Sequence, residues 1–87
     1  MHFWDWMWWL ITKASAGRQD LVAEHMPQMY AHLLEPMGIA AVPPSIDAAI
    51  VAFVARRDAL EQEYGICLPR ALEDEVLEGK RRVSRTS

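Results

Sequence analysis

Apolar residues recur at helical spacing through almost the whole of this 87-residue chain. They fall every three or four positions in several segments, which places them on one face of a helix. The alternation typical of strands is short, and no hairpin turn signal accompanies it. The pattern therefore predicts an all-α bundle of about four helices, two long and two shorter. The expected helices cover residues 2–15, 18–34, 45–64 and 70–82.

The first predicted helix is unusual because it is apolar on nearly every side. Four tryptophans fall within positions 4–9, with Asp5 among them. A helix of this kind is buried on every side or faces a partner. Two interpretations therefore stay open: the tryptophans form the core of this bundle, or part of the helix faces another domain, a second copy or a partner. Contact with a membrane surface is a third interpretation, but the basic polar face that such helices carry is absent.

Turn and cap residues set the expected helix boundaries. Gly17 is predicted to close the first helix, Ser45 to cap the start of the third, and Gly65 to end it. Pro27 lies inside the second segment, where it removes an amide donor and clashes with the preceding turn. We therefore expect a kink there, or a new helix with Pro27 in its first turn. In the third helix, Tyr64 is expected in the buried stripe and Arg57 mostly outside it.

Charge divides the chain at about residue 80. The net charge is −3, but residues 1–79 hold five Lys and Arg against twelve Asp and Glu, and KRRVSRTS adds four positive charges. We therefore predict a single helical domain over 1–79 and a basic, flexible tail over 80–87. An acidic body disfavours nucleic acid and suits a cationic ligand or a basic partner. The tail is expected to be a solvated end, with contact to nucleic acid as the alternative.

The expected compartment follows from cysteine usage and from the first segment. Cys67 is the single cysteine, so no internal disulfide forms, and this fits a reducing compartment. The first segment lacks the positive region and cleavage pattern of a signal peptide. Nine apolar-rich residues rise about 14 Å as a helix, against a hydrocarbon core of about 30 Å. We therefore expect a cytoplasmic protein without a membrane span.

No complete catalytic site is visible in the sequence. Glycine-rich phosphate loops, the G-x-S-x-G elbow and an oriented cysteine–histidine pair are missing, so we assign no catalytic residue and no cofactor. His25 and His32 would lie about 10 Å apart on a straight helix, too far to share one metal ion. We therefore assign no metal site.

Arg18 and His25 share one face of the second predicted helix. Their spacing resembles the short Arg-to-His signature of helical nuclease-like domains found in some toxin–antitoxin pairs, although Gln19 stands where asparagine is usual. A basic side chain beside a histidine can hold a phosphate and move a proton. A small helical nuclease therefore remains one alternative.

The candidate binding residues are in the first helix: Trp4, Asp5, Trp8 and Trp9. A carboxylate beside aromatic rings suits a cationic amine, because the carboxylate supplies charge and the rings attract the cation through their faces. The alternative for Asp5 is a structural one, in which it caps the helix or lies exposed at its start. The sequence leaves both possibilities open.

The stretch HFWDWMWWLITKASAGRQDLVAEHMPQMYAHLLEPMG resembles a recurring segment in the helical C-terminal, acceptor-side portion of bacterial nucleotidyltransferase-fold proteins, a group that includes antibiotic adenylyltransferases. The shared residues are Phe3, Trp4, Trp6, Lys13 and Gly17, followed by a long helix. SIDAAIVAFVARRDALEQEYG also resembles a later helix of such domains. The family's catalytic half, with its Gly-Ser turn and paired metal-binding aspartates, is missing from this sequence.

This resemblance implies a non-catalytic helical module that needs a separate catalytic domain or chain, with its first helix packed against that domain and a cationic small molecule as acceptor. The other interpretation is a stand-alone protein–protein interaction module, either a homodimer or an antitoxin or assembly helper, that uses the tryptophan-rich helix. In both cases the expected partner is another protein domain or a second copy, and neither membrane nor nucleic acid is expected.

Overall fold

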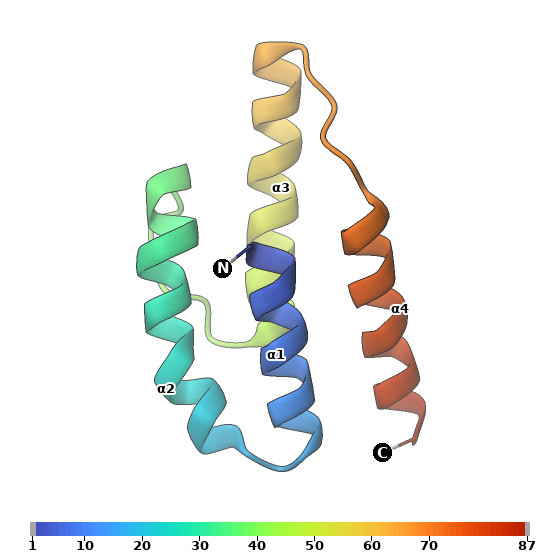
Figure 1. Cartoon of the computed structure of the whole chain (residues 1–87). Coiled ribbons are helices and arrows are strands. Elements are labelled where there is room, and N and C mark those ends of the chain that lie inside the picture. Colours follow the sequence, from blue (N-terminus) through green and yellow to red (C-terminus); the bar gives the residue numbers. More distant parts are fainter. Residues whose placement is uncertain (1, 87) are drawn as a thin grey trace.

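The computed structural model describes the backbone of residues 2–86 and the side chains of residues 2–83. Within that range the chain forms helices and no strand (Figure 1). This confirms the predicted all-α bundle of four helices. The second of them continues as a π-helical turn and then a 3-10 turn. The elements are α1 (Phe3–Ser15), α2 (Gln19–Met29), η1 (Tyr30–Leu34), η2 (Glu35–Met37), α3 (Ile46–Tyr64) and α4 (Ala71–Thr86).

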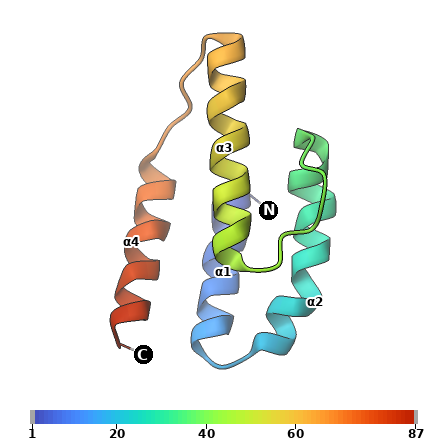
Figure 2. The same ribbon diagram turned by 180° about the vertical axis from the view of Figure 1, so that it is seen from behind.

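The tryptophan-rich helix α1 lies at the centre of the bundle. It packs against α2, α3 and α4, whereas those three helices make sparser contacts with one another. Figures 1 and 2 show α2 and α4 on opposite sides of α1, with α3 behind α1 in the view of Figure 1 and extending beyond it. The apolar character of α1 on nearly every side is therefore explained largely by burial within its own chain. Its buried residues are Phe3, Trp4, Met7, Leu10 and Ile11.

Aromatic rings join α1 to α3 in the core. The ring of Phe3 stacks on Phe53 with 3.9 Å between centroids, and Trp4 meets the same Phe53 ring edge to face at 5.6 Å. Such pairs add about 0.5–1.5 kcal/mol each beyond the area they bury. Met7 and Leu10, further along α1, are fully buried in the same core.

Local signals account for the helix ends. Gly17 has φ 78°, and the Arg18 N–H donates to the Lys13 carbonyl at 2.9 Å, which is the usual pattern of a glycine-terminated helix. The Ser45 hydroxyl accepts a hydrogen bond from the Ala48 N–H at 3.1 Å and caps α3. The predicted roles of these two residues are confirmed.

Helix α2 runs through Pro27 and ends two residues later at Met29. The predicted alternative of a new helix starting at Pro27 is therefore wrong. Proline has no N–H to donate to the carbonyl one turn earlier, so α2 lacks one hydrogen bond at that point. The π turn η1 follows α2 directly, and the segment then closes at Gly38, where φ is 89°.

Helix α4 extends further than its apolar pattern indicated. It continues to Thr86, so the predicted boundary between domain and tail at residue 80 falls inside the helix. Side-chain pairs support this extension, because Arg81 lies 2.6 Å from Glu78 one turn earlier and Lys80 forms an ion pair with Asp47 of α3. Interactions of this kind add to helix stability without leaving an apolar signature.

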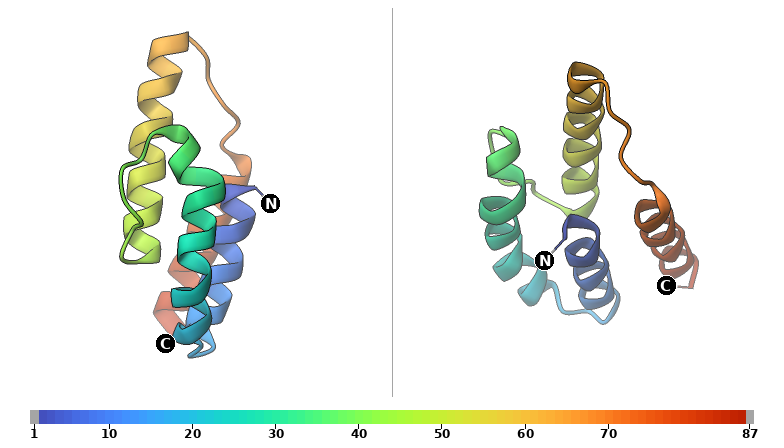
Figure 3. Two further views of the ribbon diagram at one scale, coloured as in Figure 1. Left: turned by 90° about the vertical axis from the view of Figure 1, so that its left-hand side faces the viewer. Right: turned by 45° about the horizontal axis from the view of Figure 1, so that its top comes forward.

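Two residues of α3 lie opposite to their predicted positions. The Arg57 side chain is buried, whereas Tyr64 is 68% exposed. Tyr64 is exposed because α3 extends past α1 and α2, so its last turns have only the connector to α4 beside them (Figures 1 and 3). Arg57 is buried because its guanidinium pairs with Glu73 of α4. Periodicity marks a helix face, but it does not tell how far the neighbouring helices reach.

Candidate functional site

The tryptophans of α1 point in different directions. Trp4 is in the core, with 4% of its surface exposed. Trp9 faces α2, where its ring meets His25 edge to face at 4.7 Å, and the Lys13 ammonium lies 5.4 Å from the ring centroid. Trp8 faces α4 and is 41% exposed. Of the predicted binding tryptophans, Trp8 is therefore the one that is most open to a ligand.

A groove of about 260 Å³ runs between α1 and α4 beside this indole ring. We call it the Trp8 groove. It brings together two of the predicted binding residues, Asp5 and Trp8, and excludes Trp4 and Trp9. Its lining residues are Asp5, Trp8, Leu72, Glu75, Val76, Gly79 and Arg82.

The close approach of the two helices depends on Gly79. A Cβ atom added at this position would lie 2.6 Å from Cη2 of Trp8 and closer still to Cζ3. Only glycine leaves room for the indole ring against the α4 backbone. Sequence reasoning missed this role, although a glycine inside a helical pattern is a usable signal because it costs about 1 kcal/mol relative to alanine.

Carboxylates dominate the charge of the Trp8 groove. Asp5 and Glu75 are exposed, and among the side chains of residues 2–83 neither of them forms an ion pair or a hydrogen bond with another side chain. Arg82 also lines the groove, and its guanidinium lies 3.5 Å from Glu78. An aromatic face next to two carboxylates is an arrangement that attracts a cation.

Asp5 takes the exposed position that the structural interpretation allowed. It lies in the first turn of α1, where its charge complements the helix dipole. The N-cap of this helix is His2, whose Nδ1 accepts a hydrogen bond from the Trp4 N–H at 3.3 Å. Asp5 is therefore not required as a cap, and its carboxylate is available to a ligand.

The Arg18 and His25 side chains have different neighbours. The Arg18 guanidinium donates two hydrogen bonds to Asp20, at 3.1 and 3.0 Å. These bonds raise the pKa of Arg18 and lower the pKa of Asp20. His25 packs against the Trp9 ring instead. We assign no catalytic role to this pair.

A buried ion pair that the sequence did not indicate joins α3 to the start of α4. Arg57 Nη1 lies 2.7 Å from Glu73 Oε2, and both side chains are more than nine-tenths buried. Asp58 also pairs with Arg57 at 3.0 Å. Burial alone would lower the pKa of Arg57, but the hydrogen bonds to Glu73 and Asp58 raise it. The pair links α3 to the first turn of α4.

Two further features bear on function. Within residues 2–83, no three histidine, cysteine or acidic side chains gather as a metal ion would require. In the same part of the chain, none of the helices combines the length and the apolar character needed to cross a bilayer.

No protein-family model matches the chain, and no curated protein and no solved structure is detectably similar to it.

Proposed function

We propose that the chain is a non-catalytic binding module whose Trp8 groove takes a cationic side chain of a partner protein. The observation that carries this proposal is the exposed indole of Trp8 beside two carboxylates, Asp5 and Glu75, that pair with no other side chain among residues 2–83. The indole face attracts a cation, and the carboxylates neutralise it. The excess of acidic residues over residues 1–79 favours approach of a basic partner.

The central position of α1 supports an interaction module more than an incomplete nucleotidyltransferase. The resemblance to that family implies a first helix packed against a catalytic domain. Here α2, α3 and α4 already cover most of α1. Near the start of α1, the edge carrying Asp5 and Trp8 remains open, and the groove beside it is large enough for a side chain.

The size of the groove also suits one side chain. Its volume of about 260 Å³ lies below the range of about 300–1,000 Å³ that is usual for small-molecule sites. A cation over an indole contributes about 0.5–2 kcal/mol, and an exposed ion pair about 0.2–1 kcal/mol. Because a Kd of 1 mM corresponds to about 4 kcal/mol, an isolated cation binds weakly, and the partner must add apolar contacts along Leu72 and Val76.

Nuclear magnetic resonance of the tryptophan indole N–H groups tests this proposal. N-acetyl-arginine methylamide is titrated into ¹⁵N-labelled protein, and N-acetyl-citrulline methylamide serves as a control of the same shape without charge. We expect the Trp8 signal to move with the arginine compound only, while the signal of buried Trp4 stays in place. Asp5→Asn and Glu75→Gln should each weaken the response. An equal response to citrulline would overturn the proposal.

A second candidate is the acceptor-side module with a small amine as ligand. The position of the carboxylates favours it, because Asp5 on α1 and Glu75 on α4 supply two anionic groups from different helices. In the same titration, putrescine should then bind more tightly than the arginine compound, and Trp8→Ala should abolish binding of both. Tighter binding of an arginine flanked by leucine would instead favour the partner protein.

A further inference from the structure

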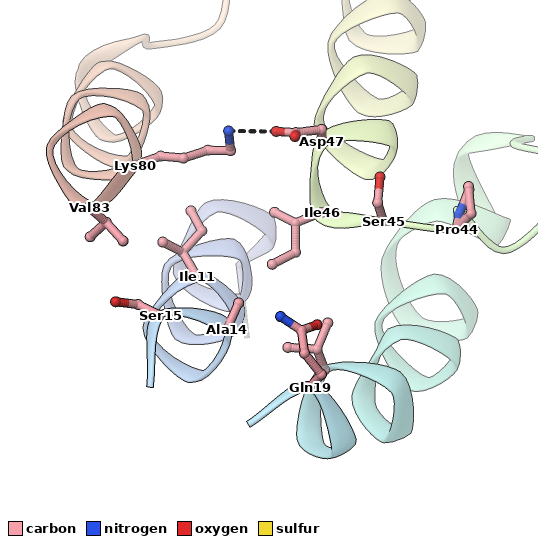
Figure 4. Close-up of a pocket in the computed structure, with 11 residues that line it drawn as sticks. Ile11, Ala14, Ser15, Gln19, Pro44, Ser45, Ile46, Asp47, Lys80 and Val83 are labelled. Atoms are coloured by element: carbon pink, nitrogen blue, oxygen red, sulfur yellow. Dashed lines mark ion pairs between the residues drawn. The ribbon is translucent and has the colours of Figure 1, made fainter. Parts of the chain in front are cut away.

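A second and larger groove lies away from the Trp8 groove, at the C-terminal ends of α1 and α4 and the N-terminal ends of α2 and α3. Its volume is about 420 Å³, within the range that is usual for small-molecule sites. Figure 4 shows its lining residues. We call it the Lys80 groove. Neither the resemblance nor the proposed function assigns it a role.

The floor of the Lys80 groove is apolar and comes from four helices. Ile11 of α1 and Val22 of α2 are buried beneath it. Ile46 of α3 and Val83 of α4 are partly buried at its sides. In Figure 4, Ile11, Ile46 and Val83 point toward a common space. A ligand in this groove would therefore lie on branched aliphatic side chains, which favour an alkyl or aryl body.

The apolar surface continues into an adjoining groove of about 270 Å³. The two grooves share Gln19, Val22 and Pro44. The second one is lined further by Met26 of α2 and by Val42, which is an exposed apolar residue of the connector before α3. Together they form a trough, which suits an elongated apolar chain more than a compact ligand.

One side of the Lys80 groove carries a cation. The Lys80 ammonium forms an ion pair with Asp47, which is drawn as a dashed line in Figure 4. The Lys80 side chain is 29% exposed, whereas that of Asp47 is 74% exposed. An ammonium group has three donors, so Lys80 can hold Asp47 and a second anion together. An ion pair this open to water is weak, so sharing Lys80 costs little.

We propose that this trough binds a small amphiphilic carboxylate, with its alkyl or aryl body on Ile11, Val22 and Ile46 and its carboxylate on Lys80. The positive charge of Lys80 favours an anionic head group over a cationic one. Lys80 begins the basic stretch of residues 80–87 in a chain that is otherwise acidic. The proposal is independent of the Trp8 groove, which is lined by different residues and takes the opposite charge.

Methyl resonances of isoleucine test the proposal on the whole chain. Octanoate is titrated into protein labelled with ¹³C at the isoleucine methyl groups, below the concentration at which it forms micelles. We expect saturable shifts at Ile11 and Ile46, while Ile66, an exposed residue of the connector before α4, serves as an internal control and stays in place. Hexanoate should bind more weakly, by about fourfold for each methylene removed.

The head group is tested with neutral octanol and with two variants of opposite expected effect. Lys80→Gln should weaken octanoate binding several-fold and leave octanol unchanged. Asp47→Asn should tighten octanoate binding several-fold, because it removes the competing anion from Lys80. Both side chains are on the surface, so both variants should fold. Octanol binding as tightly as octanoate, octanoate binding that ignores Lys80→Gln, or equal shifts at Ile66 would each overturn the proposal.

Discussion

Gly79 decides how closely the Trp8 indole can approach α4. We predict that Gly79→Ala destabilises the protein by about 1–3 kcal/mol, because a Cβ there overlaps Cη2 and Cζ3 of Trp8 and forces the ring or the helix to move. This outcome opposes the usual effect, since alanine is favoured over glycine in a helix interior by about 1 kcal/mol. Urea unfolding of both proteins measures the difference.

The Trp8→Ala background supplies the matched control for that prediction. Without the indole ring the overlap disappears, so Gly79→Ala should now stabilise the protein by about 0.5–1 kcal/mol. The reversal of sign is the diagnostic result. If Gly79→Ala has the same sign in both backgrounds, the contact with Trp8 does not explain the glycine.

Residues near one another in sequence were easier to identify as a site than distant ones. Asp5 and Trp8 are three positions apart, so their proximity on one helix could be predicted, and the structure places both in the Trp8 groove. Glu75 and Gly79 complete the groove from the far end of the chain. Their contribution depends on how α4 packs against α1, and a periodic pattern contains no information on that pairing.

At the scale of elements, the Arg57–Glu73 pair is the main charged connection between α3 and α4. We predict that Arg57→Ala costs about 3–5 kcal/mol in the free energy of unfolding, because it removes the hydrogen-bonded partner of the buried Glu73 carboxylate and leaves only Arg70, whose Nη1 is 3.8 Å away. Replacing both residues with leucine should be close to neutral. Arg81→Ala is the control, since the exposed Arg81–Glu78 pair is worth at most about 1 kcal/mol.

Chemical denaturation of these variants distinguishes a buried pair from a surface pair. A loss below about 1 kcal/mol for Arg57→Ala would show that water or Arg70 replaces the lost contact to Glu73 and that the Arg57–Glu73 pair is not needed to hold α4. The double leucine variant should then be destabilised rather than neutral.

Contacts between Glu61 and the connector that joins α3 to α4 should make the free energy of unfolding depend on pH in the acid range. The Leu68 N–H donates to the Glu61 carboxylate at 2.6 Å, and Arg70 pairs with the other oxygen. These contacts, the backbone hydrogen bond first, lower the pKa of Glu61. Its stabilising contribution is therefore full above the unfolded-state pKa, about 4.3, and is lost as pH falls through the lower folded-state pKa.

The measurement is the free energy of unfolding of wild type and Glu61→Gln between pH 7 and pH 2.5. Wild type should be the more stable at pH 7, and the difference should shrink as Glu61 becomes protonated. Two curves that stay parallel through this range would contradict the assignment of the shift to Glu61.

Helix ends could be predicted because their causes are local. Gly17 and Ser45 act through hydrogen bonds within a few residues, and each was found where the sequence indicated it. Of the two outcomes expected at Pro27, the new helix was wrong, and α4 extends further than predicted. In both cases several helical arrangements satisfy the local rules, and packing or side-chain pairing selects among them.

At the scale of the whole molecule, α1 determines the architecture. The sequence left open whether its tryptophans formed a core or a partner face. The structure divides them, with Trp4 buried against Phe53 and Trp8 exposed beside α4. The sequence of a helix that is apolar on every side does not reveal which tryptophans are buried. Their burial depends on where the other three helices lie around α1.

A bundle organised around one central helix should unfold as a single unit. We predict that Met7→Ala, at a fully buried position of α1, costs about 2–5 kcal/mol and weakens α2, α3 and α4 together, because all three pack on α1. Val51→Ala, at a position that is 68% exposed on α3, should change stability by no more than about 0.5 kcal/mol. Amide hydrogen exchange measures each helix separately. If Met7→Ala lowered protection in α1 and α2 but left α4 unchanged, α4 would be held mainly by its ion pairs to α3, and the central role of α1 would not extend to that helix.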